Sequence, residues 1–157
     1  MMRQIAVVGS DSELSGSVEK IAEGIGRDIA KEGCVLVCGG RGGVMEAACR
    51  GAKEAGGTTV GILPGLDKED ANSYIDIVIT TGMGYARNSI VVSCADAVIA
   101  VSGRVGTLSE VALALNHGKP VVVVEGSGGI SESVDQVVEG IHRAKPEEAV
   151  KAALDLI

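Results

Sequence analysis

Aromatic side chains are nearly absent from this chain of 157 residues, which has two tyrosines and neither phenylalanine nor tryptophan. Hydrophobic residues still make up 46% of it, and the length suits one domain with a buried core. We therefore expect the core to consist of valine, isoleucine, leucine and alanine. Such residues are typical of parallel strands that helices cover on both faces. We expect a single domain over residues 1–157.

An excess of positive charge is also missing, since the formal net charge is −7. This balance disfavours general binding to a nucleic acid backbone, and the lack of aromatics disfavours a stacking groove for single strands. No apolar run is long enough to cross a bilayer. The run after Arg3 is too short for a secretory signal peptide. We therefore expect no nucleic acid or membrane partner and a cytoplasmic location.

The four cysteines form no CxxC pair and have no histidine at zinc-finger spacing. We expect no metal site and interpret them as buried free thiols. Cys38 alone ends a predicted strand beside a glycine loop, which would bring it near a ligand bound there. The two histidines lie in no motif and are expected to be solvated or satisfied by neighbours.

Apolar runs and amphipathic stretches alternate along the whole chain, and many of the 23 glycines follow the apolar runs. Strands are predicted at 4–8, 35–38, 58–63, 75–79, 97–101, 121–124 and, more weakly, 141–144. Helices are predicted at about 17–31, 44–55, 85–94, 107–115, 132–139 and from 146. This alternation predicts a doubly wound parallel sheet, a Rossmann-like three-layer α/β/α fold. Right-handed crossovers then place the glycine loops at one edge of the sheet.

The stretch from Ala97 to Glu110 is the strongest candidate for a ligand site. Its apolar strand leads into a turn with Gly103 and Gly106, and Thr107 is predicted to cap the next helix. α/β proteins hold phosphate at such junctions, because free N–H groups and the helix dipole point there. Glu110 is either the capping-box partner of Thr107 or a carboxylate placed beside the bound anion.

Three further groups are candidates at the same edge of the sheet. The loop Gly39–Gly43 lacks the GxGxxG and Gly-Lys-Ser/Thr patterns, and is either a tight turn or a phosphate loop. Ser10 and Ser12 follow the first strand, where their hydroxyls either reach a phosphate or stabilise a turn. Arg87 begins a predicted helix, where the dipole disfavours a cation. It is either a surface arginine or the partner of an anion or carboxylate.

Three segments resemble the LOG (lonely-guy) family, also called lysine decarboxylase-like. Residues 39–46, GGRGGVME, resemble its first phosphate loop and helix, and residues 83–88, MGYARN, resemble the segment with its essential arginine. Residues 102–110, SGRVGTLSE, resemble its PGGxGTxxE signature. The resemblance is greatest to the branch that contains the molybdenum cofactor carrier protein. Lysine decarboxylation itself is excluded, because that chemistry normally needs a pyridoxal-bearing lysine and no loop offers one.

This resemblance implies a homodimer or a dimer of dimers that binds a small phosphorylated ligand and requires no cofactor. The ligand would be a nucleotide, phosphate or a molybdopterin-type compound. The predicted ligand contacts are Gly9, Ser10, Ser12, Gly39, Gly40, Arg41, Gly42, Gly43, Met83, Gly103, Arg104, Gly106 and Thr107. The alternative is a nucleoside 5′-monophosphate phosphoribohydrolase, which cleaves the N-glycosidic bond with Glu110 and Arg87 as catalytic residues. Ser102, Arg104 and Asn88 replace the proline, glycine and lysine usual in the hydrolases, and this favours binding over turnover.

Overall fold

A computed structural model describes all residues from 1 to 157 and contains one sheet of seven parallel strands. The strands lie in the order β4-β3-β2-β1-β5-β6-β7. Their bounds are β1 Gln4–Gly9, β2 Val35–Cys38, β3 Thr58–Leu63, β4 Ile77–Thr80, β5 Ala97–Val101, β6 Val121–Val124 and β7 Ile141–Ala144. The predicted doubly wound, Rossmann-like fold is confirmed.

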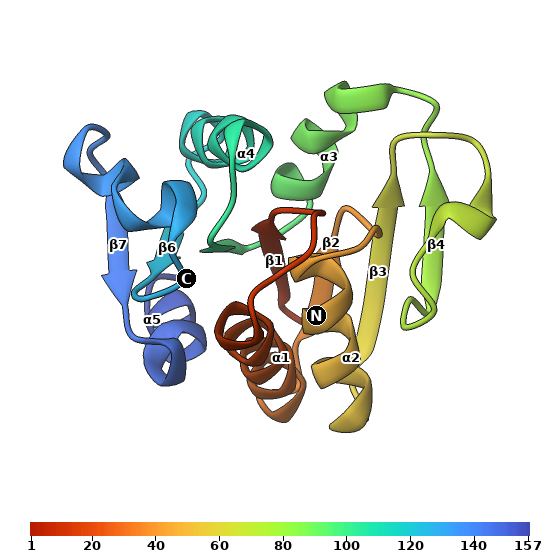
Figure 1. Cartoon of the computed structure of the whole chain (residues 1–157), viewed down its shortest axis with the longest axis horizontal. Coiled ribbons are helices and arrows are strands. Elements are labelled where there is room, and N and C mark those ends of the chain that lie inside the picture. The colour runs from red at the N-terminus through yellow and green to blue at the C-terminus, as the bar shows by residue number, and fades with distance from the viewer.

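Helices cover both faces of the sheet (Figure 1): α1, α2 and α5 lie on one face, and α3 and α4 lie on the other. Their bounds are α1 Gly16–Lys31, α2 Val44–Glu54, α3 Arg87–Ser93, α4 Val105–Asn116 and α5 Ala149–Leu154. Short 3₁₀ helices are η1 Lys68–Asp70, η2 Gly84–Ala86, η3 Gly129–Glu132, η4 Val134–Gln136 and η5 Pro146–Glu148. No helix is both long enough and apolar enough to span a bilayer.

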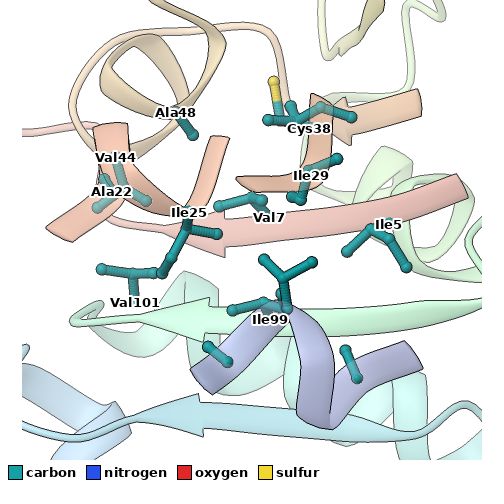
Figure 2. Close-up of a cluster of buried hydrophobic side chains, with 14 of the residues drawn as sticks. Ile5, Val7, Ala22, Ile25, Ile29, Cys38, Val44, Ala48, Ile99 and Val101 are labelled. Atoms are coloured by element: carbon teal, nitrogen blue, oxygen red, sulfur yellow. The ribbon is translucent and has the colours of Figure 1, made fainter. Parts of the chain in front are cut away.

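The core is aliphatic, as predicted. It forms two clusters, one on each face of the sheet, because alternate residues of each strand point to opposite faces. Ile5 and Val7 of β1 belong to the cluster under α1, α2 and α5, while Ala6 and Val8 belong to the cluster under α3 and α4. Figure 2 shows the first cluster, in which side chains of β1, β2 and β5 meet those of α1 and α2. Small residues let α1 approach α2, and a Cβ added to Gly26 would overlap the backbone of Ala48.

The strand order reverses at β1, which pairs with β2 on one side and β5 on the other. Ligands of open α/β sheets bind outside the carboxyl ends of the strands at such a switch point. β1 ends at Gly9 and β5 at Val101, and these two residues are paired in register. The fold therefore brings the loop after Gly9 next to the loop that leads into α4.

Two predicted helical features are wrong. The segment 132–139 contains η3, η4 and turns instead of a helix, because Glu132 accepts hydrogen bonds from Gly126 and Gly128 and Asp135 pairs with Arg143 of β7. These tertiary contacts hold the backbone away from a continuous helix.

The predicted cap of the central helix is also wrong. α4 begins at Val105, so Arg104 occupies the N-cap position and Thr107 is the third helical residue. Thr107 instead packs its side chain against Gly103. Glu110 therefore has no capping-box role. Two boundaries also differ from the prediction: β4 begins at Ile77, and η2 precedes α3, which begins at Arg87.

Candidate functional site

A cavity of about 230 Å³ opens at the carboxyl ends of β1 and β5. Three parts of the chain enclose most of it: the loop after β1, the region where η2 meets α3, and the first turns of α4. The residues that line it are Gly9, Ser10, Asp11, Ser12, Met45, Tyr85, Arg87, Asn88, Arg104, Gly106, Thr107 and Glu110. Figure 1 shows α3 and α4 as neighbours on the face of the sheet that borders this region. The loops after β1 and β5 meet at this cavity, whereas the predicted phosphate loop Gly39–Gly43 does not line it.

Arg87 and Glu110 face each other at the inner end of this cavity. Both residues are buried, with exposed fractions of 8% and 7%, and Nη1 of Arg87 lies 3.8 Å from Oε1 of Glu110. This distance allows an ion pair but is too long for a hydrogen bond. Burial raises the pKa of Glu110 to about 7, although the charge of Arg87 opposes the rise. Burial also lowers the pKa of Arg87.

Neither member of this pair has its full set of hydrogen bonds. The buried Nε of Arg87 has no hydrogen-bond partner, and the Glu110 carboxylate accepts no hydrogen bond from the protein. Buried charged groups are normally paired and hydrogen-bonded, so this incompletely paired arginine and carboxyl group at the edge of a cavity favour a polar ligand there. The site thus combines a buried cation with a carboxyl group that can be neutral or charged near pH 7.

Neighbouring residues fix the position of the Arg87 guanidinium. Its Nη1 donates a hydrogen bond of 3.1 Å to Oδ1 of Asn88, and Nδ2 of Asn88 donates one of 3.3 Å to Oγ of Ser109 in α4. Gly39, which follows β2, lies under the guanidinium so closely that a Cβ at this position would overlap it. Gly39 therefore makes room for Arg87 and does not line the cavity itself.

The N-terminus of α4 makes its side of the cavity positive. The twelve-residue helix directs the free N–H groups of its first turn and its dipole toward the cavity. Arg104 stands at the N-cap position, has an exposed side chain and forms no ion pair. An anion is therefore favoured at this wall.

The structure brings together eight of the fifteen predicted site residues at the cavity. They are Gly9, Ser10, Ser12, Arg87, Arg104, Gly106, Thr107 and Glu110. Gly42 and Gly43 line a neighbouring pocket of about 410 Å³ between the first turns of α1 and α2, and this pocket shares Asp11 and Ser12 with the cavity. Gly39, Gly40, Arg41, Met83 and Gly103 line neither space.

Several residues outside the predicted set also line the cavity. Asp11 lies between the two predicted serines, and this position is a signal that could have identified it. Tyr85 and Asn88 belong to the segment that carries Arg87, whereas Met45 reaches the cavity from α2 with no sequence signal.

The cysteines lie outside the cavity. Cys38 is fully buried, accepts a hydrogen bond from the Gly40 N–H and lies 3.6 Å from Cys49, measured between the two sulfur atoms. Cys38 does not line the cavity. Burial of the thiols is confirmed for Cys34, Cys38 and Cys49, but Cys94 is exposed. No three acidic, cysteine or histidine side chains converge as metal ligands.

The sequence and the fold both resemble known proteins. Residues 2–152 match the SLOG cluster4 family. An uncharacterized protein of Archaeoglobus fulgidus is 47% identical over 131 residues, which is 80% of this chain and 85% of that protein. A cytokinin riboside 5′-monophosphate phosphoribohydrolase of Mycobacterium tuberculosis is 33% identical over 77% of this chain and 70% of its own length.

Among solved structures, the molybdenum cofactor binding protein of the phototrophic bacterium Rippkaea orientalis superposes with a TM-score of 0.90. It is 38% identical, and the match covers 99% of this chain and 98% of that one. The resemblance that the three sequence motifs predicted is thus confirmed over nearly the whole chain. The protein belongs to the SLOG cluster4 family, a LOG-like family.

Proposed function

We propose that this protein binds a small phosphorylated ligand, either a nucleotide or a molybdopterin-type compound, in the cavity between β1 and β5. The observation that carries the proposal is the buried guanidinium of Arg87, which borders the cavity and whose protein partners are the Asn88 amide oxygen and, at 3.8 Å, the carboxyl of Glu110. An anionic ligand in the cavity would balance this buried positive charge. The similarity to a molybdenum cofactor binding protein over 99% of the chain supports the same class of ligand.

The phosphate group would lie at the N-terminus of α4, on the N–H groups of Gly106 and Thr107. Arg104 would add a positive charge, and the hydroxyls of Ser10 and Ser12 would donate hydrogen bonds from the opposite loop. A terminal phosphate carries two negative charges near neutral pH and matches this wall. The rest of the ligand would extend toward the neighbouring pocket, where the predicted contacts Gly42 and Gly43 lie.

A second candidate function is hydrolysis of nucleoside 5′-monophosphates to a base and ribose 5-phosphate. The pair of Arg87 and Glu110 favours it, because glycoside hydrolysis uses a carboxyl group that works near its own pKa. Glu110 would stabilise the positive charge at C1′ or remove a proton from the attacking water. The C1′–N bond breaks, the water oxygen bonds to C1′, and the proton removed from that water passes to the nitrogen of the leaving base. The 33% identical phosphoribohydrolase supports this candidate.

Two measurements separate these functions. Isothermal titration with adenosine 5′-monophosphate (AMP) reports binding, and an assay for ribose 5-phosphate over a panel of nucleoside monophosphates reports turnover. In a binding protein the wild type binds AMP and releases no ribose 5-phosphate. In an enzyme, Glu110→Gln abolishes the release but keeps AMP binding. Failure to bind any nucleoside monophosphate, phosphate or pterin phosphate would contradict the proposal.

We also propose that the chain forms a homodimer through α4 and the mouth of the cavity. Val105 in the first turn of α4 is 81% exposed and Tyr85 at the cavity is 91% exposed. A helix with apolar residues on most of its faces is normally covered, and α4 is such a helix. Light scattering should give the mass of a dimer, or of a tetramer if two dimers pair, and Val105→Asp should give a monomer. A wild-type monomer would contradict this assembly.

A further inference from the structure

The loop after β5 has an unusual backbone at Ser102. Its φ is +53°, and Ser102 is the only residue other than glycine with a positive φ in the chain. Such a conformation is costly for a residue with a side chain and persists only where its surroundings enforce it. Ser102 directly precedes Gly103 and Arg104, which lead into α4, so whatever holds Ser102 also sets where α4 begins.

Two serines from the loop after β6 bind both backbone groups of Ser102. The Ser102 N–H donates a hydrogen bond of 2.8 Å to Oγ of Ser127, and Oγ of Ser131 donates one of 2.7 Å to the Ser102 carbonyl. Ser127 also donates to the carbonyl of Val124 at the end of β6. The two serines are fully or almost fully buried, although neither lines the cavity. They therefore tie the loop after β5 to the end of β6.

We call the residues that hold Ser102 and Gly103 the clamp: the side chains of Ser127 and Ser131, and the backbone of Gly129 and Ile130. The Ile130 N–H donates a hydrogen bond of 2.9 Å to the Gly103 carbonyl. Gly129 packs so closely on the backbone of Gly103 that a Cβ would overlap it. The Glu132 carboxylate accepts hydrogen bonds from the N–H groups of Gly126 and Gly128 and so stabilises the loop after β6.

A proline at position 102, as in the PGGxGTxxE signature, is incompatible with this clamp. Proline fixes φ near −65° and has no N–H to donate to Ser127. We propose that Ser127 and Ser131 are positioning residues, which hold Ser102 and Gly103 so that Arg104 and the first turn of α4 face the cavity. The effect on the ligand rests on the proposed function, whereas the effect on the backbone does not.

Four variants test this proposal. Ser127→Ala removes the acceptor of the Ser102 N–H, and Ser102→Pro removes the N–H itself. Ser102→Gly keeps the N–H and accepts the positive φ, so it is the matched control at the same position. Thr59→Val removes a fully buried hydroxyl in β3 that donates to the Tyr74 carbonyl, away from the cavity, and controls for general loss of stability.

Hydrogen exchange followed by mass spectrometry tests the positioning role without a ligand. Ser127→Ala and Ser102→Pro should speed exchange in residues 102–110 more than elsewhere. Ser102→Gly should leave this segment close to wild type, and Thr59→Val should change exchange around β3 and β4 instead. Wild-type exchange in residues 102–110 of Ser127→Ala and Ser102→Pro would overturn the proposal.

Titration with AMP then tests the consequence for the site. Ser127→Ala should weaken AMP binding about fivefold, the factor that the loss of the hydrogen bond from the Ser102 N–H represents. Ser102→Gly and Thr59→Val should stay within about twofold of wild type by the same scale. Equal AMP affinity in Ser127→Ala and wild type would overturn the proposal. A wild type that binds no AMP, combined with the expected exchange pattern, would refute AMP as a ligand of this site but keep the clamp.

Discussion

Replacing Glu110 by glutamine should stabilise the protein much more at pH 8 than at pH 5. Glu110 is 93% buried, and burial raises its pKa from 4.5 to about 7. Between these values the unfolded chain has already lost the proton that the folded protein still holds. The contribution of Glu110 to stability is therefore complete below about pH 4.5 and is lost as the pH rises to about 7. Glutamine resembles the neutral carboxyl in shape and cannot ionise.

The size of the effect follows from the same pKa values. A rise from 4.5 to about 7 corresponds to about 3 kcal/mol of unfolding free energy. For a chain of this length, that is roughly 6–12 °C in the melting temperature. This value of about 7 already includes the attraction between Glu110 and Arg87, which lowers the pKa of Glu110. At pH 5, about half a unit above the unfolded value of 4.5, the difference should fall to about 0.8 kcal/mol.

Urea unfolding at pH 5, 6, 7 and 8 measures this difference directly. Glu139→Gln is the matched control, because the Glu139 side chain is exposed and forms no ion pair. It measures the effect of removing one exposed carboxylate at each pH. A constant difference between Glu110→Gln and wild type from pH 5 to 8 would refute the reasoning. A growing loss of stability in Glu110→Gln at high pH would show that Arg87 stabilises the carboxylate more than burial opposes it.

Three other predictions concern Arg87 and the glycines. Arg87→Gln should raise the pKa of Glu110 above 7, because the charge that opposes the rise is removed. It should also weaken AMP binding more than tenfold in a titration, which is the scale of a lost charged hydrogen bond. An unchanged AMP affinity would show that Arg87 is not part of the site. Gly39→Ala should push the guanidinium away and weaken AMP binding in the same titration. Gly24→Ala is the control for the next variant: its added Cβ meets no atom within 4 Å, so it should stabilise helix α1 by about 0.5–1 kcal/mol in urea unfolding. Gly26→Ala should destabilise the protein by about 1–3 kcal/mol or more, because its Cβ would overlap α2; stability equal to that of Gly24→Ala would refute the close helix contact.

The parallel sheet could be predicted from the sequence because its central strands are buried on both faces. Their residues are therefore apolar without alternation, as in Val121–Val124 and Ala97–Val101. The meeting of Arg87 and Glu110 could also be predicted, since both residues belong to motifs that follow strands whose carboxyl ends share one edge. The distance of 3.8 Å confirms that expectation.

The start of α4 could not be predicted because tertiary contacts decide it. Thr107 has the chemistry of a cap, but Ser102 adopts its positive φ only in the clamp of Ser127 and Ser131, and the helix then begins two residues earlier. The same applies to Gly39, which reads as a phosphate contact in the sequence. Its position under the Arg87 guanidinium is a contact between the loop after β2 and the start of α3, which no local pattern encodes.

A crystal structure of the protein grown with AMP tests the central claim most directly. We expect a phosphate on the N–H groups of Gly106 and Thr107, within reach of Arg104, and the rest of the ligand in the cavity beside the Arg87 guanidinium. AMP bound away from the cavity, or a cavity without it at saturating concentration while AMP binds in solution, would contradict the account.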